Sequence, residues 1–278
     1  MSLRAGTSSW SEKTWVGSFY PAGTRPADFL TYYATQFDTV EADVTYYRVP
    51  SAAMVRGWEQ KTPDGFVLAA KFPRSIVHCG EGPQPDGAKL LVPEFVADDT
   101  AEFLAAMSLL GPKCGPLVLQ FPYLNKRAFP RWEPFLERLD AYLEGLPDRF
   151  RYGVEIRNKG WVREELLAIL RRHRTALVLV DLPYMPHPAS LARDLDLFTA
   201  DFVYVRLIGD RKATEAATET FDHIALDKSD SLARWADFLR PAVARGTETY
   251  AYANNHFAGH GPATIRELAA LLRAVADA

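Results

Sequence analysis

The residues of this sequence best suited to chemistry are polar side chains at the C-terminal ends of short, otherwise apolar runs. The set comprises Glu41, Asp43, Lys71, Gln120, Glu155, Arg157, Asp181, Arg206, Asn254 and Asn255. Seven of these residues carry a formal charge, four acidic and three basic. Burying an unpaired charge costs on the order of several kcal/mol. The set therefore predicts either a polar ligand site or an internal network of ion pairs that only stabilises the fold.

As a ligand site, this set favours a small anion, because guanidinium groups bind phosphate and carboxylate through paired hydrogen bonds. The expected ligand-binding residues are Trp10, Tyr46, Gln120, Arg157, Arg206, Asn254 and Asn255. The expected catalytic residues are Glu41, Lys71, Glu155 and Asp181, with Asp43 as a further candidate acid or base. Lys71 could bind the anion or act as a Schiff-base amine. A hydrolase, lyase or isomerase with carboxylate acid–base chemistry fits these residue types.

The alternation of side chains along a strand indicates which of these residues share a face. Residues two apart point to the same side of a strand. Glu41 and Asp43 therefore lie together, opposite the apolar residues between and before them. Glu155 and Arg157 share a face in the same way. We expect these polar faces to point toward the ligand site and the apolar faces toward covering helices.

Aromatic residues form a second signal in the segments that follow the runs. Trp10, Trp15, Tyr46, Tyr47 and Trp161 lie in such segments. Rings in these positions could stack on a base or a sugar, or could simply anchor the loops by packing. Two further tryptophans, Trp132 and Trp235, fall in helical patterns and are expected in the core.

The cysteines and histidines give weaker signals. Cys79 and Cys114 lack C-x-x-C spacing, so we expect two reduced thiols, although Cys79 beside His78 could form a nucleophile pair. A metal site of Glu41, Asp181 and His256 can be imagined, but no metal is expected and no cofactor is indicated. His256 and His260 are four residues apart, yet Gly259 and Gly261 predict a loop there.

Eight short β-rich runs must position these residues. The runs are Leu3–Ser8, Thr39–Asp43, Phe66–Lys71, Leu117–Phe121, Arg151–Arg157, Ala176–Asp181, Phe202–Leu207 and Glu248–Ala253. Between most of them lie segments with helical spacing of apolar residues, such as Arg131–Leu146 and a final helix containing Ile265, Leu268, Ala269, Leu272 and Val275. Pro26, Ser51 and Pro262 mark helix starts.

Alternating strands and helices predict an α/β fold with a parallel sheet, a (β/α)8 TIM-type barrel forming one domain over residues 1–278. The active sites of such barrels lie at the C-terminal mouth, where the polar ends would converge. A doubly wound open sheet is the alternative. It would usually show a glycine-rich phosphate loop after the first strand, and Gly6 to Trp10 is not one.

Composition limits the class of protein. The chain has 278 residues, 48% hydrophobic and 24% charged, which excludes intrinsic disorder, and its apolar runs are too short to span a membrane. The N-terminus lacks an apolar signal core, so we expect a cytoplasmic protein. The net charge of −3 argues against coating nucleic acid by bulk charge, though a local basic pocket stays open.

The same residues resemble a known family, the YecE-like barrels of domain of unknown function 72. The matching segments include Gly6–Trp10 with Trp15, Glu41 with Thr45–Arg48 and Pro50, Gln120–Pro122, Val154–Arg157 with Trp161, Asp181, Tyr204–Leu207 with Gly209, and Tyr252 with Asn254 and Asn255. The resemblance spans nearly the whole chain in order. It implies a TIM-type barrel with a polar pocket at its mouth and no settled activity.

The chain departs from the family pattern at positions relevant to catalysis. The family usually has Asn at Asp43, His at Ile208, and His at Asn158. The loss of two histidines weakens any histidine-based chemistry carried over from the family. Two alternatives to the enzyme stay open: a protein that binds or processes nucleic acid or phosphodiesters, which the acidic charge disfavours, and a non-catalytic interaction barrel. The last predicts a fully self-paired polar cluster with no open pocket.

Overall fold

Eight parallel strands form a nearly closed barrel in the computed structural model, which describes residues 3–273. The strands are β1 (Leu3–Thr7), β2 (Thr39–Ala42), β3 (Val67–Lys71), β4 (Cys114–Gln120), β5 (Tyr152–Glu155), β6 (Ala176–Asp181), β7 (Phe202–Leu207) and β8 (Glu248–Ala253). Their order in the sheet is β1-β8-β7-β6-β5-β4-β3-β2. The predicted (β/α)8 fold is confirmed, with every strand within a few residues of its expected run.

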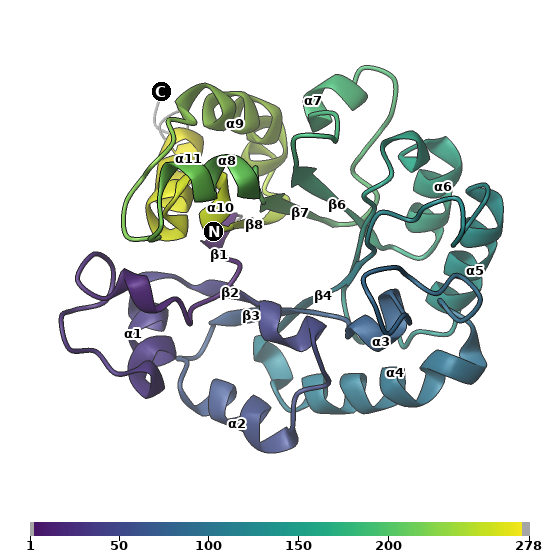
Figure 1. The fold of residues 1–278 in the computed structure, drawn as a ribbon, viewed down its shortest axis with the longest axis horizontal. Helices are drawn as coiled ribbons and strands as arrows, with labels where there is room; N and C mark the ends of the chain where they lie inside the picture. The colour runs from purple at the N-terminus through teal and green to yellow at the C-terminus, as the bar shows by residue number, and fades with distance from the viewer. Residues whose placement is uncertain (1–2, 274–278) are drawn as a thin grey trace.

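Helices surround the barrel and cover its outer face, as Figure 1 shows. The α-helices are α1 (Phe29–Gln36), α2 (Ala52–Gln60), α3 (Arg74–Val77), α4 (Pro93–Ser108), α5 (Glu133–Glu144), α6 (Glu164–Arg172), α7 (Pro188–Leu191), α8 (Arg211–Ala217), α9 (Ser229–Ala244), α10 (Asn255–Ala258) and α11 (Gly261–Arg273). Within residues 3–273, there are also five short 3-10 helices: η1 (Lys13–Trp15), η2 (Pro26–Asp28), η3 (Asp43–Tyr46), η4 (Gly111–Lys113) and η5 (Lys159–Trp161).

The predicted helix starts have clear physical causes. Pro26 opens η2, where its missing N–H would be unpaired in any case. Ser51 precedes α2, and its hydroxyl accepts the N–H of Met54 as an N-cap. Pro262 follows the first residue of α11. The predicted residue Val275 lies outside the described residues.

One predicted loop is wrong. The stretch from His256 to His260, expected to be a loop because of its glycines, contains the short helix α10. Asn254 caps that helix through its side chain, and Gly259 ends it with a left-handed φ of 106°. Asn254 therefore stabilises the start of α10, and Gly259 ends the helix.

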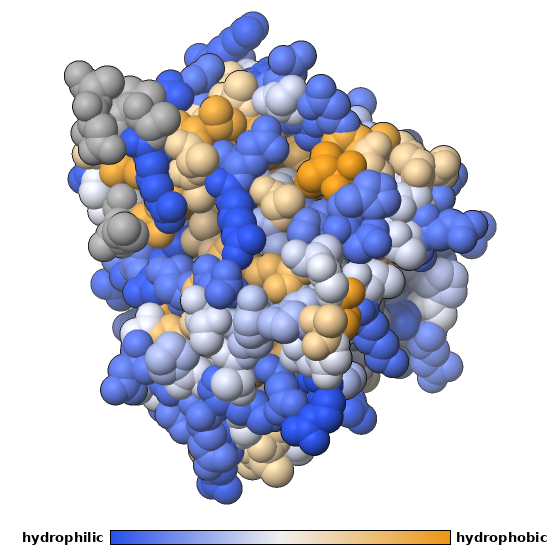
Figure 2. All heavy atoms as spheres, turned by 90° about the vertical axis from the view of Figure 1, so that its left-hand side faces the viewer, coloured by the Kyte–Doolittle hydropathy of each residue, from blue (hydrophilic) through white to orange (hydrophobic). Residues whose placement is uncertain are grey.

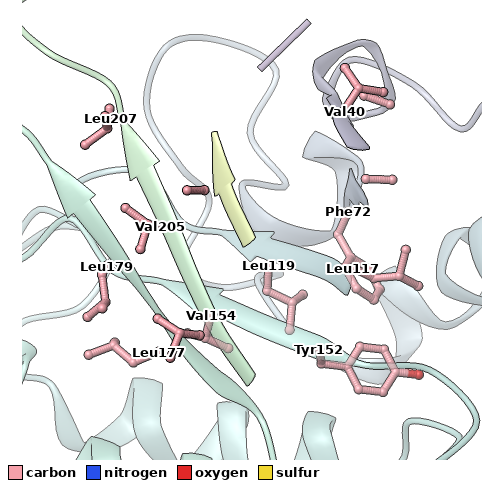
Figure 3. Close-up of a cluster of buried hydrophobic side chains, with 14 of the residues drawn as sticks. Val40, Phe72, Leu117, Leu119, Tyr152, Val154, Leu177, Leu179, Val205 and Leu207 are labelled. Carbon is pink, nitrogen blue, oxygen red and sulfur yellow. The ribbon is translucent and has the colours of Figure 1, made fainter. Parts of the chain in front are cut away.

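The outward face of each strand builds the main hydrophobic core against the helices. Figure 3 shows part of it, with Val154 on β5, Leu179 on β6 and Val205 on β7 pointing to the same layer. Of the tryptophans in helical patterns, Trp235 on α9 is fully buried and Trp132 packs half-buried against this core. The helical stripes therefore bury the sheet as their spacing predicts.

The inward face builds a second, smaller core. Val67, Val118 and Val178 lie in the lower and middle barrel with Tyr204 and Tyr252. Above them, toward the C-terminal ends of the strands, the inward side chains become polar. The barrel interior is filled by side chains, as in other barrels of eight strands.

Gly6 on β1 permits a close approach to β2. A Cβ atom at this position would lie 2.3 Å from the carbonyl oxygen of Thr39. Within residues 3–273, β1 is hydrogen-bonded to β8 and stands at one end of the strand order, with β2 at the other. Glycine at this position lets β1 and β2 lie together although their ladder is not formed.

A helix that spans a membrane must meet a minimum of length and apolarity. Among residues 3–273, no helix is both long and apolar enough to cross a bilayer. On the face seen in Figure 2, apolar residues appear as separate patches among charged ones.

Candidate functional site

Five polar side chains from five strands meet inside the upper barrel. They are Glu41 of β2, Lys71 of β3, Gln120 of β4, Glu155 of β5 and Arg206 of β7. All five are buried, with exposed fractions between 0% and 8%. Each lies on the inward face that strand alternation predicts. The structure thus brings together five of the residues expected at the mouth. They lie inside the barrel, below the level that solvent reaches.

Arg206 is the centre of this cluster. Its Nη2 and Nε donate to Glu41 Oε1 at 2.8 and 3.1 Å. Its Nη1 donates to Glu155 Oε2 at 2.5 Å and to Gln120 Oε1 at 2.8 Å. Burial alone would lower the pKa of Arg206, but the carboxylates of Glu41 and Glu155 outweigh it and raise the pKa. The guanidinium therefore holds two buried carboxylates at once.

Lys71 links the cluster to the solvent boundary. Its Nζ donates to Asp43 Oδ1 and lies 3.6 Å from Glu41 Oε1. Burial would raise the pKa of Asp43, but the Lys71 ammonium lowers it below its usual value. Asp43 begins η3, one residue past β2, and its side chain is 36% exposed. It is therefore an ionised carboxylate that solvent reaches.

Glu155 joins the cluster to Arg157. Arg157 Nε donates to Glu155 Oε1 at 2.7 Å. Burial would raise the pKa of Glu155, but the charges of Arg206 and Arg157 lower it to about 2. A carboxylate with this pKa is ionised throughout the physiological range, so it cannot serve as a proton donor there.

Tyrosines below the cluster complete its hydrogen bonds. Tyr204 donates its hydroxyl to Glu41 Oε2 at 2.7 Å, and Tyr252 shares a 2.7 Å hydrogen bond with Thr39. Burial and the Glu41 charge raise the pKa of Tyr204 well above its usual value. Sequence reasoning missed Tyr204, although its place two residues before Arg206 puts it on the same face.

The cluster is electrically balanced. Glu41, Asp43 and Glu155 face the three cations Lys71, Arg157 and Arg206. Every carboxylate and every cation has an oppositely charged neighbour, which is what the burial of so many charges requires. We call these six residues the mouth network.

Arg157 keeps hydrogen-bonding capacity that the network does not use. Its side chain is 24% exposed, and among residues 3–273 its two Nη groups have no hydrogen-bond partner. The half-buried Tyr46 lies near Arg157 and Arg74. Burial raises the pKa of Tyr46, and the charges of both guanidinium groups partly offset this increase. The anchored Nε and the open Nη edge form an oriented fork at the barrel mouth.

Asp181 is not part of the network. Its Oδ2 accepts the indole N–H of Trp235 at 2.7 Å and the hydroxyl of Ser231 at 3.3 Å, both on α9. Asp181 shares the outward face of β6 with Leu177 and Leu179. The expectation that it converges on the mouth is wrong, and the alternation rule itself would have excluded it.

The side-chain carbonyl oxygens of Asn254 and Asn255 accept hydrogen bonds from backbone N–H groups. Asn254 Oδ1 accepts the N–H of His256 at 3.0 Å, and Asn255 Oδ1 accepts the N–H of Gly261 at 2.9 Å. Both residues therefore shape the α10 turn. Their placement gives them a capping role that their position after a strand did not reveal.

The aromatic residues divide into anchors and exposed rings. Trp10 is half-buried, with its ring edge-on to Trp58 at 5.7 Å, whereas Trp15 is 1% exposed and packs in the core. Trp161 is half-buried against Phe135 at 5.3 Å. Tyr47, which follows η3, is 73% exposed. Of the predicted stacking rings, only Tyr47 is freely accessible.

Metal and thiol chemistry receive no support from the geometry. Glu41 lies inside the barrel, Asp181 faces α9, and His256 Nδ1 lies 2.8 Å from Asn254 Oδ1. In the described part of the chain, no group of three or more suitable side chains could hold a metal ion. Burial raises the pKa of Cys79 to about 11 and that of Cys114 to about 12, so neither is a ready thiolate.

Comparisons with known proteins agree with this barrel. Residues 4–278 match the family model described as "Protein of unknown function DUF72". A DUF72 family protein of Thermotoga maritima MSB8 is 25% identical, with a TM-score of 0.69 over 100% of both chains. One from Enterococcus faecalis V583 is 19% identical, with a TM-score of 0.69 over 98% of this chain and 95% of its own.

Among curated proteins, the UPF0759 protein YecE of Escherichia coli (strain K12) is 33% identical over 153 residues. That match covers 55% of this chain and 47% of YecE, so it spans about half the length of this relative. These likenesses confirm the resemblance noted in the sequence. They assign no reaction.

Proposed function

The chain belongs to the DUF72 family, and from that premise we propose that it is an enzyme acting on a small anionic substrate at the C-terminal mouth of its barrel. The substrate carries a phosphate or carboxylate group, on a body that could be carbohydrate-like. Arg157 binds the anion, and Asp43 is the carboxylate that meets the rest of the substrate. The buried part of the mouth network holds these two residues in place.

The single observation that carries the proposal is the state of Arg157. Its Nε is fixed on Glu155 at 2.7 Å, while both Nη groups, at the boundary with solvent, have no hydrogen-bond partner within residues 3–273. A guanidinium held in this way loses little conformational entropy when it binds a planar oxyanion through two hydrogen bonds. Such preorganisation increases affinity because the ordering cost is already met in the free protein.

Asp43 is the network carboxylate best placed for acid–base work. Glu41 and Glu155 are both 0% exposed, so a substrate cannot reach them without displacing the network. Asp43 Oδ1 contacts Lys71, while no hydrogen bond to Oδ2 is formed within residues 3–273. With its lowered pKa, Asp43 is ionised at neutral pH, and in this form it acts as base or as acceptor for a substrate hydroxyl.

The remaining residues of the mouth network, together with Gln120, become positioning residues in this proposal. Glu155 orients Arg157, Arg206 holds Glu155 and Glu41, and Lys71 holds Asp43. Gln120 accepts from Arg206 and thereby fixes its guanidinium. This distribution of roles differs from the sequence-based expectation, which gave Glu41, Glu155 and Lys71 direct parts in the reaction.

The test is ligand-induced stabilisation. The purified protein is heated with phosphate, sugar phosphates, dicarboxylates and short single-stranded oligonucleotides, because a ligand that binds only the folded state raises Tm. We expect an anion to raise Tm for the wild type and for Arg245→Gln, an exposed arginine with no side-chain partner among the described residues. Arg157→Gln should lose that shift when its Tm with the anion is compared with its own Tm in the absence of the anion, which falls because Glu155 loses a partner. An undiminished shift in Arg157→Gln would refute the role of the fork.

A non-catalytic interaction barrel is the second candidate, and one observation favours it. The mouth network balances its own charges, which is the arrangement expected when the cluster only stabilises the barrel. In this case no small anion raises Tm, and Arg157→Gln lowers the Tm of the free protein more than Arg245→Gln does, because only Arg157 pairs with a buried carboxylate. The same screen therefore separates the two candidates.

Nucleic-acid binding remains a weaker alternative. Tyr47, Tyr123 and Tyr184 are exposed in segments that follow β2, β4 and β6, where rings could stack on bases. The net charge of −3 counts against it. Stabilisation by an oligonucleotide that falls steeply with salt would favour this alternative over a small substrate.

A further inference from the structure

A second cluster of arginines lies at the opposite end of the barrel, where the strands begin. A cavity of about 620 Å³ opens there. Three arginines line it, Arg4 on β1, Arg149 and Arg151 just before β5, together with Glu248 at the start of β8. We call this cavity the basal pocket.

Glu248 holds two of these arginines in place. Arg4 Nε donates to Glu248 Oε1 at 3.1 Å, and Arg151 Nη1 donates to Glu248 Oε2. Burial would raise the pKa of Glu248, but the hydrogen bonds from Arg151 and Arg4 lower it. The carboxylate therefore stays ionised and fixes two guanidinium groups at the pocket wall.

In the described part of the chain, Arg149 forms no ion pair with a carboxylate. Among residues 3–273, its only side-chain hydrogen bond goes from Nη2 to the hydroxyl of Ser108 at 3.3 Å. Its guanidinium carbon lies 5.0 Å from the centroid of the Phe150 ring, which supports the side chain from one side. Arg149 is thus a charged donor whose remaining N–H groups have no partner among the described residues.

The lining of the basal pocket carries an excess of positive charge. Three arginines against the single carboxylate of Glu248 leave two unit charges. Asp38 lies 3.4 Å from Arg4 and Asp201 lies 3.8 Å from Arg151, but their side chains are 51% and 77% exposed and neither lines the pocket. Exposed pairs at such distances contribute little and are readily displaced.

We propose that the basal pocket binds a phosphate monoester, with Arg149 as the residue that completes the site. A phosphate dianion matches the excess of two charges, and its oxygens suit guanidinium donors. Phe150 and Val67 add an apolar wall that could take a small organic group. This site is separate from the mouth, so it does not depend on the proposed reaction.

The test uses hydrogen exchange followed by mass spectrometry, with inorganic phosphate and glycerol 3-phosphate as probes and sodium chloride at equal ionic strength as the reference. Bound phosphate should slow exchange in the segments 108–114 and 148–151. We expect this protection in the wild type, in Arg157→Gln and in Arg193→Gln, an exposed arginine without a side-chain partner among the described residues. Arg149→Gln should weaken phosphate binding about tenfold or more in a titration.

The outcomes distinguish the basal pocket from the mouth. Protection of 108–114 and 148–151 that is lost in Arg149→Gln and kept in Arg157→Gln and Arg193→Gln supports the basal pocket. Protection only near residues 43–48 and 155–161, lost in Arg157→Gln, supports the mouth and overturns this inference. No protection at saturating probe, or protection that Arg149→Gln retains, also overturns it.

Discussion

The two ends of the barrel differ in how their charged side chains are stabilised. At the mouth, three carboxylates and three cations are largely buried and their charges cancel. At the base, Arg4, Arg149 and Arg151 surround one carboxylate, and their charges do not cancel within the pocket lining. Water can solvate the exposed arginines of the base, whereas buried charges must be paired inside the protein. We therefore expect the buried cluster at the mouth to affect mainly stability, and we expect ligand binding where the pairing of charges is incomplete.

The largest effect should come from Arg206→Met at the mouth. This change keeps much of the side-chain volume but leaves Glu41 and Glu155 buried without their main cation. Breaking a buried pair in this way costs about 3–5 kcal/mol. Urea unfolding at pH 7 measures the loss. Adding Glu41→Gln and Glu155→Gln should restore part of it, and a loss below about 1 kcal/mol would show that the mouth is no more tightly coupled than the base.

Acid should weaken the mouth through Glu155. Its folded-state pKa of about 2 lies below the ordinary value of 4.5, so its ionisation stabilises the fold above about pH 4.5. That contribution, on the order of 3 kcal/mol, is lost as the pH falls from 4.5 toward 2. Urea unfolding at pH 7, 4 and 3 should therefore show a smaller pH dependence for Glu155→Gln than for the wild type. Parallel curves for both proteins would contradict the low pKa.

A smaller loss is expected for Tyr204→Phe. The change removes the hydroxyl that donates to Glu41 Oε2 at 2.7 Å and leaves that oxygen buried with one partner fewer. A hydrogen bond to a charged group contributes about 1.5–3 kcal/mol. The free energy of unfolding measured in urea should fall by that amount. Tyr250→Phe is the matched control at the base, because its hydroxyl interacts with Arg151 and Glu248, whose side chains are partly exposed.

The smallest effect should be that of Arg4→Gln at the base. Arg4 is 23% exposed and contacts Glu248 and Asp38, whose side chains are also partly exposed. Such pairs contribute about 0–1 kcal/mol, and salt screens them. Thermal unfolding at 0.05 and 0.5 M salt should place Arg4→Gln within about 1 kcal/mol of the wild type. A loss as large as that of Arg206→Met would remove the contrast between the two ends.

Much of the mouth could be predicted from the sequence because a strand has a simple period. Glu41, Lys71, Gln120, Glu155 and Arg206 all face inward, as alternation requires. The error at Asp181 came from using its position at a strand end and neglecting that Leu177 and Leu179 share its face.

The ion pairs of the mouth network and the arginines of the basal pocket could not be predicted from strand alternation. Which carboxylate meets Arg206 depends on the stagger of strands that are far apart in sequence, a property of the closed barrel. The roles of Asn254 and Asn255 in the α10 turn could not be predicted, because the turn was expected to be a loop. Their side chains accept backbone N–H groups that reach them only in the folded chain. The basal arginines lie at or just before the starts of strands. A search for polar residues at the C-terminal ends of strands does not find them.

The order of strands also has a consequence for how the chain reaches its fold. β1 pairs with β8, with Leu3 opposite Thr249, so the first strand finds its partner only when nearly all of the chain is present. Closing so long a loop costs entropy before any contact rewards it, and contacts of high sequence separation slow folding. The β1–β8 ladder therefore cannot form during synthesis before β8 has been made, and we expect the barrel to close late in folding.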